Sequence, residues 1–236
     1  MHGVAMKTVA IIPAAGAGKR MESGVSKQYL ELEGVPILVR TLGIFEKTAS
    51  VDAVFLVVPA GDVDTVRRDM VLPHRLAKVR EILSGGRERQ DSVRAGIDAL
   101  GPDTEIVVIH DAVRPFVTAE LIGATVEGAR AFGAVSLGVP VKDTVKSVEP
   151  DGWVGHTMER SKLWLTQTPQ AFRRGIIQEA YRRAFAEGVY ATDDASLVER
   201  IGIRVRMIPG AYENIKITTP GDLASGAVIV GSRGKV

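Results

Sequence analysis

An apolar run near the start of the chain ends abruptly in a loop of small residues, and this transition constrains the fold more than any other stretch. Residues 8–12 read as a buried strand of a parallel sheet, and residues 13–18, Pro-Ala-Ala-Gly-Ala-Gly, follow at once. Small residues allow backbone N–H groups to approach an anion closely, and glycine tolerates the backbone angles that such a loop needs. Lys19, Arg20 and Lys27 come next, where they can reach phosphate oxygens. The pattern indicates a loop that binds a triphosphate.

Two standard phosphate-binding motifs are similar to this loop but do not match it. The dinucleotide fingerprint requires a third glycine where Met21 stands. The P-loop requires a glycine in place of Pro13 and a hydroxyl residue in place of Arg20. A tight strand-to-helix connection with surface lysines is the simpler alternative, but it does not require three cations after an Ala-Ala-Gly loop.

The composition is that of an ordinary globular protein, and the length fits one large α/β domain or one domain with an excursion. The chain has 236 residues, of which 45% are hydrophobic and 25% charged. We expect a single domain over 1–236 with an excursion at 140–168. The net charge of +2 gives no reason to expect a nucleic-acid surface, so the local cations matter more than the total.

The sequence lacks the features of several kinds of site and of membrane or secreted proteins. Without cysteine the chain has no disulfide, no thiolate metal site and no cysteine nucleophile, and its four histidines show no metal-ligand spacing. No run approaches the roughly 18 apolar residues of a membrane span. The segment before the first strand is too short for a secretory signal. We therefore expect a cytoplasmic enzyme without membrane contacts.

Strands and helices alternate along most of the chain. Strands are expected at 8–12, 54–58, 79–83, 105–109, 134–139 and 204–208, and helices at 37–48, 62–70, 89–100, 119–132, 175–187, 195–201 and from 222. This alternation predicts a mostly parallel sheet with helices on both faces.

A β-hairpin is predicted where the alternation breaks. Residues 141–148 and 153–158 read as its strands, joined by the turn Glu149–Gly152. A two-stranded arm is marginally stable by itself. We therefore expect the arm to pack against a second subunit.

Polar residues cluster immediately after the predicted strands, where open α/β sheets bind their ligands. The segment 85–93, Gly-Gly-Arg-Glu-Arg-Gln-Asp-Ser-Val, follows the third strand, with Ser92 in the first turn of the next helix. A polar helix start is the alternative explanation. Asp111 follows the fourth strand and can contact a metal-bound phosphate or a sugar hydroxyl. His110 is interpreted as structural, and Arg114 either binds an anion or pairs with a carboxylate such as Asp111.

Later segments contribute further candidates. Thr192 and Asp193 precede a helix, and a simple N-cap is the alternative for either of them. Lys216 lies in an extended stretch between Ile215 and Ile217, whose side chains point to the opposite face. The Lys216 amine is therefore directed at a particular place.

Seven stretches together resemble the 2-C-methyl-D-erythritol 4-phosphate cytidylyltransferases of the non-mevalonate isoprenoid pathway. They are PAAGAGKRM with Lys27-Gln28-Tyr29, GGRERQDSV, HDAVRP, Lys142-Asp143-Thr144, ERSKLWLTQTPQ, TDDAS and ENIKITTPGDL, and they span 13–223. The first occurs in many sugar nucleotidyltransferases, whereas the combination is much more specific. The resemblance implies a Rossmann-like nucleotidyltransferase fold with a protruding β-hairpin arm. It also implies transfer of CMP from CTP to methylerythritol 4-phosphate, with pyrophosphate leaving and Mg²⁺ bound with the CTP phosphates.

The resemblance assigns roles to individual residues. The nucleotide would be held by Pro13, Ala14, Ala15, Gly16, Gly18, Gly86, Arg87, Ser92, Asp111 and Ala112. Arg20 and Lys27 would stabilise charge on the triphosphate, and Arg160 and Lys216 would position the incoming phosphate. The methylerythritol phosphate would lie among Asp111, Arg114, Thr144, Arg160, Thr168, Thr192 and Lys216. Because the arm exchanges between subunits of a homodimer in the family, Arg114, Thr144 and Thr168 can serve the partner's site.

The implied chemistry agrees with the residues available. The attacking group is already a phosphate anion, so no serine, cysteine or histidine nucleophile has to be activated. Cations that align two mutually repelling anions are sufficient for in-line displacement. The nearest rival is a cytidylyltransferase for another polyol phosphate such as ribitol 5-phosphate. A regulatory protein that binds a nucleotide without turnover is the rival from another class. The chain departs from the family pattern at Arg87, where an acidic residue is common, and at Val113, where alanine is.

Overall fold

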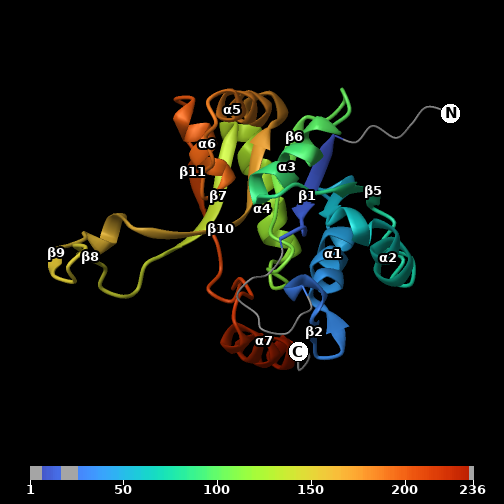
Figure 1. Cartoon of the computed structure of the whole chain (residues 1–236), viewed down its shortest axis with the longest axis horizontal. Helices are drawn as coiled ribbons and strands as arrows, with labels where there is room; N and C mark the ends of the chain where they lie inside the picture. The colour runs from blue at the N-terminus through green and yellow to red at the C-terminus, as the bar shows by residue number, and fades with distance from the viewer. Residues whose placement is uncertain (1–6, 17–25, 234–236) are drawn as a thin grey trace.

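The chain folds around a seven-stranded sheet in a computed structural model that describes residues 7–16 and 26–233 (Figure 1). Its strands are β1 (Thr8–Pro13), β4 (Ala53–Val58), β5 (Val79–Ser84), β6 (Ile106–Ile109), β7 (Ala134–Pro140), β10 (Trp164–Arg173) and β11 (Arg206–Pro209). They lie in the order β11-β7-β10-β6-β1-β4-β5. Strand β10 runs antiparallel to both neighbours, and the other pairs are parallel.

Helices cover both faces of this sheet. They are α1 (Ile37–Lys47), α2 (Val63–Val66), α3 (Arg89–Asp98), α4 (Ala119–Phe132), α5 (Arg174–Ala186) and α6 (Asp194–Arg200), and a π-helical turn at Arg67–Val71 continues α2. Helix α7 (Pro220–Arg233) packs instead on a separate apolar cluster that includes Leu32 and Phe116. Short 3₁₀ turns lie at Lys27–Tyr29, Ala60–Asp62 and Arg160–Lys162. Two small hairpins, β2 (Glu31–Leu32) with β3 (Val35–Pro36) and β8 (Lys146–Val148) with β9 (Val154–Thr157), complete the elements. The strands and helices expected in the alternating part of the chain are present, with ends that agree to within about two residues, and the helix expected at 62–70 is divided between α2 and the π-helical turn. The first strand of the arm is shorter than expected, because β8 begins at Lys146 and not at residue 141.

The alternation of side chains along β1 explains the layered architecture. Ala10 and Ile12 pack toward α1, α2 and α4, whereas Val9 and Ile11 pack toward α3, α5 and α6. All four side chains are fully buried. A parallel strand buried on both faces must be apolar throughout, which is why the run at 8–12 reads so clearly. The expected fold class is confirmed.

Strand β10 was not among the predicted strands, because its sequence is polar. Its buried residues include Gln167, Thr168 and Gln170. Gln170 donates from Nε2 to Asp193 Oδ2 at 2.7 Å and accepts from the Asp194 and Ala195 amides through Oε1. Such polar side chains are stable inside a sheet only when distant segments supply their partners, so no local pattern marks this strand.

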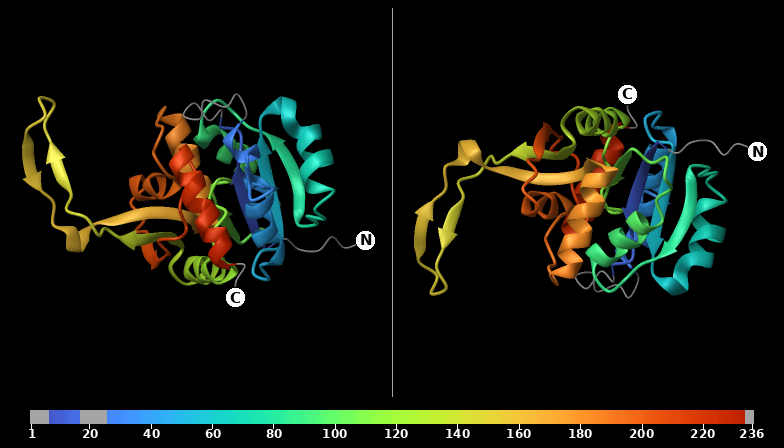
Figure 2. Two further views of the ribbon diagram at one scale, coloured as in Figure 1. Left: turned by 90° about the horizontal axis from the view of Figure 1, so that it is seen from below. Right: turned by 90° about the horizontal axis from the view of Figure 1, so that it is seen from above.

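The predicted arm is present and extends away from the sheet (Figure 2). Strands β8 and β9 pair antiparallel, and the turn between them ends at Gly152, whose φ of +91° suits glycine. Large apolar side chains are exposed on it, including Trp153 at 76% and Val148 at 59%.

No helix of the described residues combines the length and apolar character that a membrane crossing needs.

Candidate active site

The loops that follow three strands of the sheet meet beyond the carboxyl ends of those strands. They follow β1, β5 and β6, and the extended segment 214–217 joins them. Parallel strands that end at one edge bring such loops together, and these loops enclose a pocket. Its lining residues are Pro13, Ala15, Gly16, Lys27, Gln28, Arg89, Ser92, Asp111, Ala112, Val113 and Lys216.

The loop after β1 is held closely against the loop after β5. A side chain at Gly85 would place its Cβ 2.3 Å from the Ala15 Cβ and 2.8 Å from Ser92 Oγ, so only glycine allows this approach. On the other side, buried Gln28 donates from Nε2 to the Ala14 carbonyl at 2.7 Å. These contacts hold the backbone at Ala14 and Ala15, the described part of the small-residue loop.

Asp111 is the central charge of the pocket. Its Oδ2 lies 2.8 Å from Lys216 Nζ and 3.6 Å from Arg114 Nε, and its Oδ1 lies 3.0 Å from Arg89 Nε. Its backbone N–H donates to Thr168 Oγ1 at 3.0 Å. Burial alone would raise the pKa of Asp111, but the three cations outweigh burial and hold that pKa well below its usual range. Asp111 is therefore an anion that keeps three cations in place.

Lys216 reaches this carboxylate as its sequence context predicts. Ile217 is fully buried on the side of α7, and its N–H donates to the Val113 carbonyl at 2.9 Å. The alternation of an extended chain then turns Lys216 toward the pocket.

His110 lies directly beside the site but is built into the core. Its side chain is fully buried, its ring packs 5.2 Å from the Phe45 ring, and its nitrogens face the Arg114 carbonyl and Thr168 Oγ1 at 3.1 Å. Burial lowers the pKa of His110 to about 4, so the ring is neutral at physiological pH. The interpretation of this histidine as structural agrees with its surroundings.

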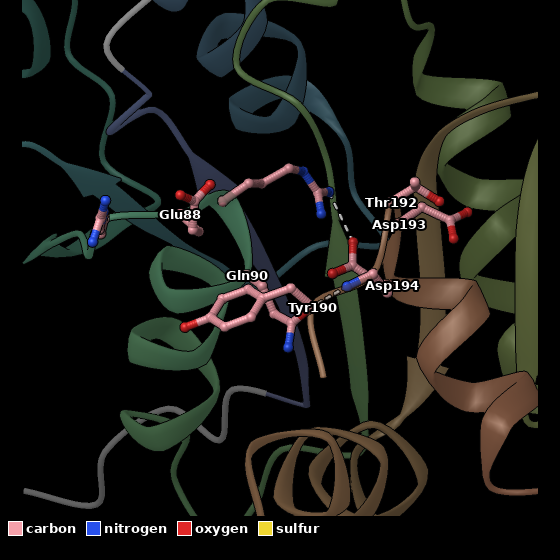
Figure 3. Close-up of a pocket in the computed structure, with 9 residues that line it drawn as sticks. Glu88, Gln90, Tyr190, Thr192, Asp193 and Asp194 are labelled. Atoms are coloured by element: carbon pink, nitrogen blue, oxygen red, sulfur yellow. Dashed lines mark hydrogen bonds and ion pairs between the residues drawn. The ribbon is translucent and has the colours of Figure 1, made fainter. Parts of the chain in front are cut away.

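A second pocket, shown in Figure 3, shares Arg89 with the first. Its walls are Arg87, Glu88, Arg89, Gln90, Tyr190, Ala191, Thr192, Asp193 and Asp194. Arg89 donates to Asp194 Oδ2 at 2.8 Å while it also holds Asp111, so one guanidinium forms a wall of both pockets. Asp193 is the N-cap of α6, with Oδ1 accepting from the Ser196 amide at 3.0 Å. The N-cap alternative is therefore correct for Asp193, whereas Thr192 lies exposed at the pocket.

The structure brings most of the candidate residues to these two pockets. The first pocket collects Pro13, Ala15, Gly16, Lys27, Ser92, Asp111, Ala112 and Lys216, and the second contains Arg87 and Thr192. The Ala14 carbonyl accepts from Gln28 of the first pocket, Gly86 precedes Arg87, and Arg114 and Thr168 contact Asp111 of the same chain. Gly18 and Arg20 lie outside the described residues.

Thr144 and Arg160 lie elsewhere, on the arm. Arg160 donates from Nη1 to the Lys142 carbonyl at 2.6 Å. Neither residue lines a pocket at the sheet edge of its own chain.

Sequence reasoning missed three residues that shape the site: Arg89, Gln28 and Asp194. All three stand inside segments that the sequence marks as polar and next to a strand or helix end. Their importance depends on partners far along the chain, so their segments could be found but their contacts could not.

A mostly parallel sheet with a small-residue loop after its first strand and cations converging at the same edge defines a Rossmann-like nucleotidyltransferase. Residues 8–232 match the family described as 2-C-methyl-D-erythritol 4-phosphate cytidylyltransferase. The chain belongs to this family.

Relatives and solved structures agree. The chain is 51% identical over 217 residues to the 2-C-methyl-D-erythritol 4-phosphate cytidylyltransferase of Syntrophus aciditrophicus, covering 92% of this chain and 93% of that one. It is 49% identical over 221 residues to the enzyme of the same name from Geobacter metallireducens, with 92% and 95% covered. The crystal structure of 4-diphosphocytidyl-2C-methyl-D-erythritol synthase from Anaerococcus prevotii superposes with a TM-score of 0.86 at 32% identity, covering 96% of this chain and 97% of that one.

Membership defines the reaction class. Enzymes of this family are cytidylyltransferases that form 4-diphosphocytidyl-2-C-methyl-D-erythritol from CTP and methylerythritol 4-phosphate in isoprenoid biosynthesis. The family assignment favours methylerythritol phosphate over the ribitol phosphate of the rival reading.

Proposed function

We propose that this chain transfers CMP from CTP to methylerythritol 4-phosphate in the pocket around Asp111. A phosphate oxygen of methylerythritol 4-phosphate attacks the α-phosphorus of CTP and forms a new P–O bond. The bond from the α-phosphorus to the oxygen that bridges it to the β-phosphorus breaks, and pyrophosphate leaves. The observation that carries this proposal is the meeting of Lys27, Lys216 and the Ala15-Gly16 loop in one pocket. Preorganised cations of this kind compensate charge that develops during phosphoryl transfer.

The residues divide into a nucleotide set and a polyol set. For the nucleotide and its phosphates we propose Pro13, Ala14, Ala15, Gly16, Gly18, Gly86, Arg87, Ser92, Asp111 and Ala112, with Arg20 and Lys27 on the triphosphate. For the methylerythritol phosphate we propose Asp111, Arg114, Thr144, Arg160, Thr168, Thr192 and Lys216, with Arg160 and Lys216 positioning its phosphate. Arg89 supports both sets, because it lies between the two pockets.

The donor set suits a Mg²⁺ ion that arrives with CTP. Within residues 7–16 and 26–233, no group of three His, Asp or Glu side chains could hold a metal, and Asp111 is already paired with cations. Mg²⁺ commonly takes one or two protein carboxylates and completes its shell with water and substrate phosphates. We therefore propose that Mg²⁺ would be bound mainly by the CTP phosphates, with Asp111 as the carboxylate that the first pocket could offer. When bound, the ion neutralises and orients the triphosphate.

The arm is proposed to complete the site of a second copy. We treat 1–236 as one domain from which 140–168 extends as a dimerisation arm. Trp153, at 76% exposure, gives the arm an apolar surface that association would cover. Thr144 and Arg160 then serve the partner's pocket. We propose the cytoplasm as the location, because both substrates are charged metabolites.

Pyrophosphate release tests the proposal. The protein is supplied with CTP and Mg²⁺, and methylerythritol 4-phosphate and ribitol 5-phosphate are offered in separate reactions. We expect release with the first only. Release with ribitol 5-phosphate alone would keep the mechanism and change the polyol, and release with neither from folded protein would overturn the proposal.

A further inference from the structure

The segment 189–192 is tied to helix α3 by one buried side chain. Gln90 donates from Nε2 to the Val189 carbonyl at 2.9 Å, and its Oε1 accepts from the Ala191 amide at 2.9 Å. Gln90 is only 5% exposed. Both ends of its carboxamide are thus used on a backbone about a hundred residues away in sequence. Ala191 is followed in sequence by Thr192, which lines the second pocket.

The two residues beside Gln90 contact the chain at Tyr190 and at Asp194, just beyond this segment. Asp91 Oδ1 accepts from the Tyr190 hydroxyl at 2.8 Å, while its Oδ2 accepts from the Glu88 amide at 2.9 Å in the N-terminal capping box of α3. Arg89 donates to Asp194 Oδ2 at 2.8 Å. Three consecutive side chains of one helical turn therefore hold residues 189–194. Figure 3 shows Thr192, Asp193 and Asp194 across the pocket from Glu88.

The rest of this segment has a separate anchor. Asp193, Asp194 and Ala195 are held by Gln170 of β10, and Val189 N–H donates to the Ala184 carbonyl at 2.8 Å. Between these anchors, Ala191 depends on Gln90. Among the described residues, no other hydrogen bond to the Ala191 amide is seen. Loss of Gln90 therefore affects the stretch that carries Thr192 more than it affects α6.

We propose that Gln90 is a positioning residue for the polyol phosphate, acting through Ala191 on Thr192. The inference rests on the proposed function, in which Thr192 contacts that substrate. The position of Gln90 in the chain would suggest a role toward the nucleotide instead. Gln90 stands next to the nucleotide residues Gly86 and Ser92, yet its side chain serves the other substrate.

The test compares the two Michaelis constants in the Gln90→Met variant of the full-length enzyme. Methionine keeps a similar volume but makes neither hydrogen bond. We expect KM for methylerythritol 4-phosphate to rise about tenfold, while KM for CTP changes less than about twofold. Gln178→Met is the matched control, because Gln178 lies on α5 away from both substrate sets and bonds Arg174. It should change neither constant.

A second variant keeps the test informative if Gln90→Met does not fold. Tyr190→Phe removes only the hydroxyl that bonds Asp91, and we expect a rise of about threefold in the polyol KM alone. Equal rises in both KM values, or no rise in either, would overturn the inference and leave Gln90 as part of the scaffold. If the unsubstituted enzyme uses neither polyol phosphate, the proposed function fails and the inference fails with it.

Discussion

Lys216 Nζ lies 2.8 Å from Asp111 Oδ2, at the point where a segment near the end of the chain meets the loop after β6. The same carboxylate lies 3.0 Å from Arg89 Nε. Because Asp111 stays ionised, it fixes the lysine amine at the edge of the pocket instead of leaving it to sample solvent. A fixed cation is what transfer between two anions requires.

Replacing this lysine should reduce turnover strongly. In Lys216→Met we expect kcat/KM for methylerythritol 4-phosphate to fall about 10²-fold, or about 3 kcal/mol, because a preorganised charge is lost. Pyrophosphate release at saturating CTP is the measurement. Lys47→Met, at the exposed end of α1, is the control and should retain full activity. Near-native turnover in folded Lys216→Met would contradict the assignment.

Removing the carboxylate should instead destabilise the fold. Asp111→Asn leaves Arg89, Arg114 and Lys216 close together without their counter-charge, and we expect the free energy of unfolding to fall by about 3 kcal/mol. Denaturant titration measures the change. Asp69→Asn breaks a solvent-exposed pair with Arg68 and should lower the free energy of unfolding far less, because solvent screens that pair. Equal losses of unfolding free energy in the two variants would show that the ion pairs of Asp111 stabilise the fold no more than an exposed pair does.

The layers of the fold were predictable because their cause is local. Strands such as β1 and β4 are buried on both faces and therefore consist of continuous apolar residues. The positions of the ligand loops follow, since loops after parallel strands gather at one edge. Asp111 and Lys216 could be selected for this reason before any contact was known.

What escaped prediction depends on pairs of segments far apart in the chain. Gln170 is stable inside the sheet because Asp193 and Asp194 satisfy its carboxamide, and neither residue is near it in sequence. Arg89 stands in a segment that was singled out, but its bridge between Asp111 and Asp194 exists only after three elements have packed. Buried polar contacts of this kind leave no periodic signal for a single sequence to reveal.

The buried histidine should make stability depend on pH. The pKa of His110 is about 4 in the folded chain and about 6.5 when unfolded, so the unfolded chain binds more protons between these values. The stabilisation is complete above pH 6.5 and is lost as the pH falls toward 4. Between pH 7 and pH 5 the histidine should account for about 2 kcal/mol of lost stability.

His110→Gln isolates this contribution, because glutamine does not titrate. Denaturant unfolding of both proteins at pH 7 and pH 5, at one protein concentration, is the measurement. The variant should lose about 2 kcal/mol less than the parent over this interval. Equal losses would mean that His110 is not kept neutral by burial.

Mixing two inactive variants should reveal whether the arm serves a partner. Arg160 lies on the arm, whereas Lys216 lies in the pocket of its own chain. In a heterodimer of Arg160→Ala and Lys216→Met chains, one pocket carries both defects. The other pocket combines an intact Lys216 with an intact Arg160 from the partner. Random exchange of equal amounts should then restore about a quarter of the parent activity, since half the dimers are mixed and half of their sites are intact. Sedimentation velocity on each variant checks that dimers form. Exchanged dimers without recovered activity would show that Arg160 acts within its own chain and does not serve the neighbouring site.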